Sequence, residues 1–185
     1  MSDARSIVTR AAVLALLLLS GCGGRPPGPG GHPLPKPTAT ARLIDSTGKH
    51  IGLAIFTATD TGTTVGISIA GLAPGLHGLH IHEAGRCTPP DFASAGAHFN
   101  PTARHHGLQN PEGPHLGDLP NLLVGADGSA DTSLSLDPVL LRPGPLSLLD
   151  SAGTALVVHA ERDDQRSDPS GGSGARIACG IITAN

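Results

Sequence analysis

The chain has 185 residues, a length that suits one domain with a hydrophobic core. Charged residues make up 15% of it and the formal net charge is −3, so it lacks the basic character of a nucleic-acid-binding protein. Its 26 glycines and 17 prolines favour short strands and turns over long helices.

The N-terminal segment predicts export. Arg5 and Arg10 precede the apolar run AAVLALLLLSG, which has the length of a signal-peptide core and is too short to span a bilayer comfortably. The run ends in LSGC, and a small residue before a cysteine here resembles a bacterial lipoprotein signal. We expect residues 1–21 to be a lipoprotein signal peptide and Cys22 to carry the lipid that anchors a cell-envelope protein, periplasmic or membrane-anchored. The alternative is an ordinary secretory signal with an incidental cysteine.

Residues 22–37 are expected to form a tether, because GGRPPGPGGHPLPKP is rich in glycine and proline and has too few apolar residues to pack a core. The folded domain is expected over residues 38–185. If Cys22 carries lipid, Cys87 and Cys179 remain, and two cysteines in an oxidising compartment predict one disulfide. Two buried free thiols are the alternative.

The domain has the pattern of an all-β protein. Partial alternation with β-branched residues predicts strands at 38–45, 50–59, 63–72 and 75–83, and again at 121–128, 129–137, 146–153, 154–161 and 175–184. The intervening stretch, about residues 84–121, has no sustained period, and a bound metal would explain how so long a loop stays ordered. Short strands with closely spaced turns predict a Greek-key β-barrel or sandwich, immunoglobulin-like, of about eight strands with long metal-binding loops.

Histidines gather in the segment GLHGLHIHE. Residues two apart in a strand point to the same face, so His80 and His82 can meet one metal ion. His77 is out of phase with them and is expected to support the site or the strand rather than to bind metal. His159 lies far away on another predicted strand, and alone it is a core or edge histidine.

The long loop adds more ligand-type residues: His98, His105, His106, His115 and Asp118. Three histidines and one aspartate suit a tetrahedral zinc ion. The alternative is a solvated polar loop.

Six separated motifs resemble the copper/zinc superoxide dismutases, in their order and nearly in their spacing. They are GLHGLHIHE, AGAHFNP, HHG, PHLGDLPN, VVHAERDD and GARIACG, and the resemblance covers about residues 40–184. The bacterial envelope branch of the family fits best, given the signal segment and the short final loop.

The resemblance implies one copper and one zinc ion per chain. Copper would bind His80, His82, His98 and His159, and zinc would bind His98, His106, His115 and Asp118, with His98 bridging the two ions through both ring nitrogens. Asp163 would link a copper histidine to a zinc histidine. Arg176 would guide and anchor the anionic substrate beside copper, and Cys87 and Cys179 would form the family's disulfide. His50 and His105 match no functional position.

The implied reaction converts superoxide to O₂ and H₂O₂, with His98 passing a proton to the product and the cell envelope protected from superoxide outside the cytoplasm. The segment DDQRSDPSGGSG has few basic residues, so steering of the anion is expected to rest on Arg176, with Arg86 or Arg104, or to be weak. A non-enzymatic envelope protein that holds copper and zinc on the same fold is the main alternative. A cupin-like enzyme with one metal is a second, but Glu83 points to the wrong face to serve as its glutamate ligand. Monomer and homodimer both stay open.

Overall fold

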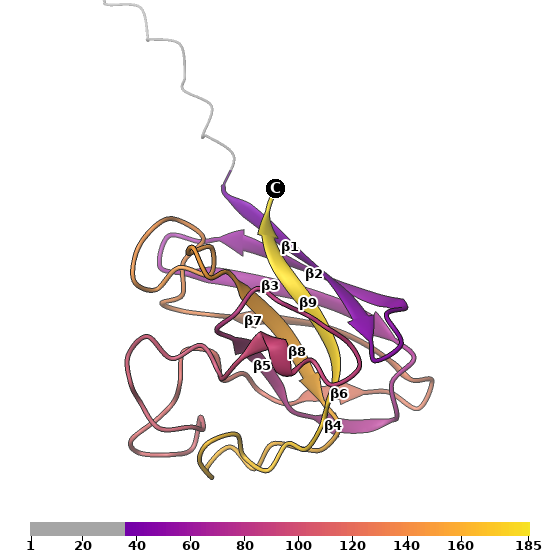
Figure 1. The fold of residues 1–185 in the computed structure, drawn as a ribbon. Helices are drawn as coiled ribbons and strands as arrows, with labels where there is room; N and C mark the ends of the chain where they lie inside the picture. The colour runs from indigo at the N-terminus through magenta and orange to yellow at the C-terminus, as the bar shows by residue number, and fades with distance from the viewer. Residues whose placement is uncertain (1–35) are drawn as a thin grey trace, which may run out of the picture. The chain divides into compact units, whose positions relative to one another are not determined.

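The computed structural model describes residues 36–185, and the regular secondary structure of this part of the chain is almost entirely antiparallel strands, joined by long loops (Figure 1). The strands are β1 (Thr38–Asp45), β2 (His50–Ala58), β3 (Thr63–Ala70), β4 (Gly75–His77), β5 (Leu79–His82), β6 (Leu122–Val124), β7 (Ser129–Ser135), β8 (Thr154–His159) and β9 (Arg176–Ala184). One 3₁₀ helix, Ala93–Ala95, is the only helix in this range. No helix among these residues has the length and apolar character needed to cross a membrane. The predicted signal peptide, Cys22 and most of the predicted tether lie outside the described residues.

Seven strands form one curled sheet in the order β5-β8-β9-β1-β2-β3-β7, and β4 pairs with β6 in a small second sheet. Alternate residues of β3 point inward: Val65, Ile67 and Ile69 are buried, and the residues between them are exposed or half-buried. The all-β barrel class predicted from the sequence is therefore confirmed, and β3 alternates as a half-buried strand should.

Two sequence-based strand predictions need correction. Residues 146–153 form turns, and only Ser147 makes a bridge, to Leu140. Their apolar pattern arises because Leu148 is fully buried in the core. The predicted strand 75–83 is split at Gly78, so β4 pairs with β6 while β5 pairs with β8.

The sheet has a second buried layer on the outer face of β8. Leu156 and Val158 belong to the main core, whereas Ala155 and Val157 pack against Phe92 and other residues of the long loop, which we define as residues 83–121. A strand buried on both faces gives this loop a firm base. The Cys87–Cys179 disulfide joins the loop to β9 and confirms the predicted bridge.

The long loop also covers the free edge of β5. Phe99 donates its backbone N–H to Ile81, and Ile81 donates to Gly117, at 2.8 Å each. A side chain at position 117 would collide with the Ile81 carbonyl, because a Cβ atom there would lie 2.3 Å from that oxygen. The edge strand is thus paired rather than exposed. The loop segments around Phe99 and Gly117 are thereby held beside the histidines of β5.

Candidate metal centre

Six histidines and two aspartates meet on the outer face of β5, and all eight are buried. They come from β5, the long loop, the end of β8 and a second loop, which we define as residues 160–175. They are His80, His82, His98, His106, His115, Asp118, His159 and Asp163. The tertiary structure therefore brings together all the metal ligands that the family resemblance implies, together with Asp163.

The first cluster is formed by His80, His82, His98 and His159, each of which offers a ring nitrogen within 4.8 Å of the others. The Nδ1 atoms of His82 and His159 lie 2.9 and 3.2 Å from backbone carbonyl oxygens. A carbonyl can only accept, so in both rings Nδ1 carries the proton and Nε2 is free. These two Nε2 atoms are 3.4 Å apart.

The other two rings of this cluster each present a buried nitrogen that has no hydrogen-bond partner among residues 36–185. These atoms are His80 Nδ1 and His98 Nε2. Buried polar atoms are normally paired, so two orphaned nitrogens beside two free ones indicate a ligand that the protein itself does not supply. Four imidazole nitrogens are a donor set that suits copper.

The second cluster surrounds one carboxylate oxygen. Asp118 Oδ1 lies 2.9 Å from His98 Nδ1, 3.0 Å from His106 Nδ1 and 3.3 Å from His115 Nδ1, and His98 and His115 Nδ1 are 3.4 Å apart. Donors bound to zinc at 2.0–2.1 Å in a tetrahedron are separated by about 3.3 Å. The spacing of these four atoms therefore fits a zinc ion.

His80 also lies close to the second cluster, because a ligand atom of His80 falls within 4.8 Å of those of His98, His106 and Asp118. However, His80 Nε2 is already bound to Asp163 at 2.6 Å. His115 Nδ1 faces Asp118 and His98 directly and is the better fourth member.

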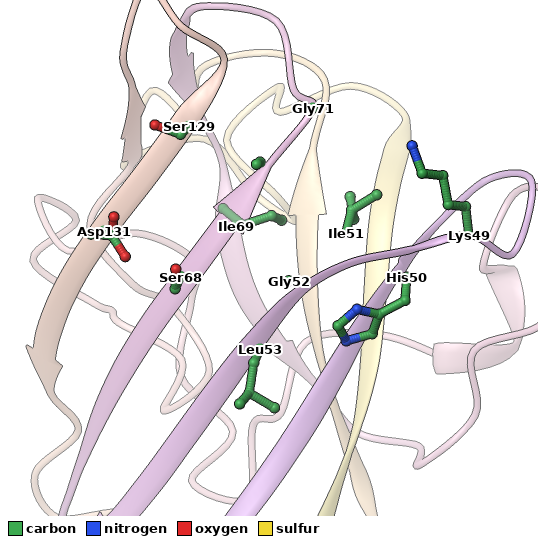
Figure 2. A pocket seen from close by; sticks show the side chains of 11 residues that line it. Lys49, His50, Ile51, Gly52, Leu53, Ser68, Ile69, Gly71, Ser129 and Asp131 are labelled. Atoms are coloured by element: carbon green, nitrogen blue, oxygen red, sulfur yellow. The ribbon is translucent and has the colours of Figure 1, made fainter.

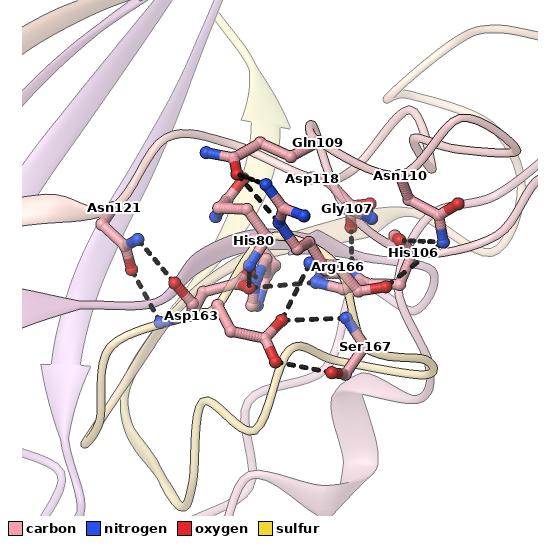
Figure 3. A network of polar contacts seen from close by, with 12 residues as sticks. His80, His106, Gly107, Gln109, Asn110, Asp118, Asn121, Asp163, Arg166 and Ser167 are labelled. Atoms are coloured by element: carbon pink, nitrogen blue, oxygen red, sulfur yellow. Dashed lines mark hydrogen bonds and ion pairs between the residues drawn. The ribbon is translucent and has the colours of Figure 1, made fainter.

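Asp163 joins the two clusters (Figure 3). Its Oδ2 accepts a hydrogen bond from His80 Nε2 at 2.6 Å, and its Oδ1 accepts one from His106 Nε2 at 3.1 Å. Both rings must carry a proton on Nε2, so Nδ1 is the nitrogen of each ring that can bind a metal.

Two residues that hold Asp163, Asn121 and Gln165, were not predicted from the sequence. Asn121 binds the Asp163 backbone through both its side-chain atoms, at 2.8 and 2.9 Å. Gln165, in a left-handed conformation with φ 64°, donates its backbone N–H to Asp163 Oδ1 at 2.6 Å. Asn121 closes the quoted motif PHLGDLPN, but its partner lies 42 residues away and no local pattern predicts the contact.

Burial and charge act differently on the two clusters. Burial lowers the pKa of His80 to about 4, of His159 to about 3 and of His82 to about 2, so these rings are neutral at pH 7. Burial also opposes the charged form of His106, but the carboxylates of Asp118 and Asp163 outweigh it and raise the pKa of His106 to about 9. Without a metal, the second cluster thus holds a proton between two carboxylates.

Arg176 stands at the start of β9, beside the first cluster. Its Nη1 donates to the Phe92 carbonyl at 2.8 Å and its Nη2 to the Gly96 carbonyl at 2.7 Å. The Gly96 oxygen also accepts the hydrogen bond from His82 Nδ1. One carbonyl therefore joins the guanidinium to a ring of the cluster.

The three remaining histidines among residues 36–185 contribute no atom to either cluster. His77 is buried, with its ring nitrogens 2.8 Å from the carbonyl oxygens of His159 and Ala73. His105 is exposed and pairs with Asp168 and, at 3.4 Å, with Glu112. His50 is exposed and lines a depression on the outer face of β2 and β3 (Figure 2).

Arg104, one of the arginines considered for steering, is already engaged, because it donates to the Gly113 carbonyl at 2.8 Å. Arg166, in the second loop, donates to Gln109 Oε1 at 2.9 and 3.1 Å (Figure 3).

Comparison with known proteins identifies the relatives of this chain. The profile of the family described as "Copper/zinc superoxide dismutase (SODC)" matches residues 50–182. The superoxide dismutase-like protein YojM of Bacillus subtilis is 42% identical over 184 residues, covering 94% of each chain. The protein named superoxide dismutase [Cu-Zn] 2 of Aquifex aeolicus is 45% identical over 146 residues, covering 78% of this chain and 85% of the relative. A crystal structure of an SOD-like protein from Bacillus subtilis superposes with a TM-score of 0.75 at 43% identity, over 77% of this chain and 96% of that one.

Proposed function

Because the chain belongs to the copper/zinc superoxide dismutase family, we propose that its first cluster holds copper and its second cluster holds zinc. The chain is a superoxide dismutase, which converts superoxide to O₂ and H₂O₂ with copper and zinc as cofactors. Which residues hold each ion is part of the proposal.

His98 carries the proposal. Its Nδ1 lies 2.9 Å from Asp118 in the second cluster, while its Nε2 is buried without a partner among the described residues. A ring that turns one nitrogen to each cluster is suited to bridge two metals. His80, His82 and His159 would complete the copper site, and His106, His115 and Asp118 the zinc site.

Copper, when bound, supplies a centre that can take an electron from one superoxide and give an electron to the next. The protein supplies the proton transfers. When copper does not hold it, His98 Nε2 would be the atom suited to take up a proton and pass it to the reduced product, because Nδ1 faces the zinc cluster. Asp163 keeps the proton of His80 and of His106 on Nε2, which orients both rings.

Arg176 would attract the substrate. Superoxide is an anion, and the positively charged Arg176 guanidinium lies beside the first cluster. The guanidinium and His82 donate hydrogen bonds to the same Gly96 carbonyl. His77 would support the site by holding the carbonyl of His159.

The disulfide supports an exported protein, because such bonds persist in oxidising compartments. The proposed envelope location adds a lipid on Cys22, which lies outside the described residues. Globomycin, which blocks removal of lipoprotein signals, should cause the uncleaved precursor to accumulate; normal processing in its presence would exclude the lipid anchor.

Reconstitution tests the enzymatic assignment. The purified chain should bind one copper and one zinc ion and consume superoxide in a xanthine oxidase assay. Full metal occupancy without superoxide consumption would establish a non-enzymatic binding protein instead. His98→Ala should weaken both sites, whereas His50→Ala, on a distant exposed position, should bind metal as the unmodified chain does.

A further inference from the structure

A groove on the protein surface borders the first cluster. Its walls include Gly96 and Gly174, whose carbonyl oxygens accept hydrogen bonds from His82 and His159. Arg176 lines the same groove. The groove wall is therefore directly hydrogen-bonded to two rings of the first cluster, and an anion in the groove lies next to that wall.

Among residues 36–185, Asp91 and Arg176 are the two charged residues that line the groove, and Asp91 is the negative one. Asp91 is exposed, and its Oδ1 accepts the backbone N–H of Ala93 at 3.0 Å. It directly precedes Phe92, whose carbonyl accepts the hydrogen bond from Arg176 at 2.8 Å. Phe92 thus connects the two groups, because Asp91 precedes it in the chain and Arg176 is hydrogen-bonded to its carbonyl. The two opposite charges are close enough to interact electrostatically.

The effect of Asp91 on Arg176 agrees with this placement. Burial lowers the pKa of Arg176, and the negative charge of Asp91 acts against that change. The carboxylate of Glu83 lies behind the groove wall: its Oε1 accepts the backbone N–H of Ala97, a groove residue, at 3.2 Å, and its side chain lines a different depression together with Asp150.

We propose that Asp91 sets the rate at which superoxide reaches the first cluster, by cancelling part of the attraction that Arg176 exerts on the anion. The inference rests on the proposed function. Asp91 thereby slows the capture of superoxide by a chain whose net charge of −3 already repels anions. One unit charge at about 8–10 Å in water changes the local concentration of a monovalent anion about two-fold.

Asparagine removes this charge and keeps the contact. Asp91→Asn retains a side-chain oxygen that can accept the Ala93 N–H, and so does Asp91→Ser, since serine hydroxyls form the same turn contact with the backbone two residues on, more weakly. The second-order rate constant for superoxide should rise about two-fold in both variants at low ionic strength. The gain should disappear near 1 M salt, where the Debye length is about 3 Å.

Asp131→Asn is the matched control. Asp131 is exposed on β7, at the opposite end of the sheet from β5, so its removal changes the net charge equally but not the groove. Its rate constant should stay within about a quarter of that of the unmodified enzyme. Metal content is measured for every variant, and rates are expressed per bound copper ion.

Three outcomes overturn the inference. The first is an unchanged rate constant at low salt in both Asp91 variants. The second is a gain that persists at high salt, which would indicate a structural effect. The third is an equal gain in Asp131→Asn, which would indicate net charge alone. If the unmodified, metal-loaded chain consumes no superoxide, the proposed function itself fails, and this inference fails with it.

Discussion

Asp163 offers the sharpest test of how the two clusters are coupled, through the variant Asp163→Asn. Its two carboxylate oxygens accept hydrogen bonds from His80 Nε2 at 2.6 Å and from His106 Nε2 at 3.1 Å. An asparagine has one accepting oxygen, and its NH₂ group can only donate. One of the two rings would then face a donor, and would have to lose the hydrogen bond or move its proton to Nδ1, the atom proposed to bind metal.

The expected loss is large because the contacts are buried and charged. Asp163 is fully buried, and burial raises its pKa, yet the hydrogen bonds from His106 and His80 hold that pKa well below its usual range. A hydrogen bond to a charged group contributes about 1.5–3 kcal/mol. Loss of such a support typically lowers metal affinity about 10–100-fold. We expect a decrease of that size for at least one of the two metals.

Competition against a chelator of known affinity, run separately for copper and zinc, measures the change. Asp164→Asn is the control, because it removes the same charge from the neighbouring residue. The Asp164 carboxylate is exposed and accepts only from Arg166 and Ser167 among the described residues. If Asp163→Asn binds both metals within about two-fold of the unmodified chain, the coupling argument is wrong.

His80→Ala should lose copper and superoxide consumption but keep zinc; metal analysis that finds copper retained would refute the assignment of His80. Asp118→Ala should raise hydrogen exchange across the long loop by about ten-fold or more, because its Oδ2 accepts the backbone N–H groups of Gly107 and His115 as well. The metal-free protein should lose stability on both sides of neutral pH. Below pH 6.5 the unfolded chain takes up a proton that His80, with a folded pKa of about 4, does not, so the free energy of unfolding falls by as much as about 1.4 kcal/mol per pH unit. For His106, with a pKa raised to about 9, the contribution is complete below pH 6.5 and is lost as the pH rises to 9. Urea denaturation at several pH values checks both slopes, and a flat profile between pH 5 and 9 would contradict them.

The sequence alone determined the β class and the metal-ligand candidates. Alternation along residues 63–70 predicts a half-buried strand, and the spacing of His80 and His82 places both on one face, because strand geometry has a period of two. These conclusions depend on neighbours within a few residues, and local periodicity records them directly. Residues 146–153 have the same alternation without being a strand, since burial of Leu148 in a turn produces the same apolar pattern.

Only the tertiary structure decided which ring nitrogen is free and which groups share a groove. The orientation of His82 depends on the Gly96 carbonyl, 14 residues away, and that of His80 depends on Asp163, 83 residues away. Asp91 and Arg176 face the same groove although 84 positions separate Phe92 from Arg176. Hydrogen bonds of this range form when the long loop packs on the outer face of β8, and no local pattern carries that information. The sequence therefore predicts which residues form the centre, and the tertiary structure determines which ring nitrogen of each histidine is available to bind a metal.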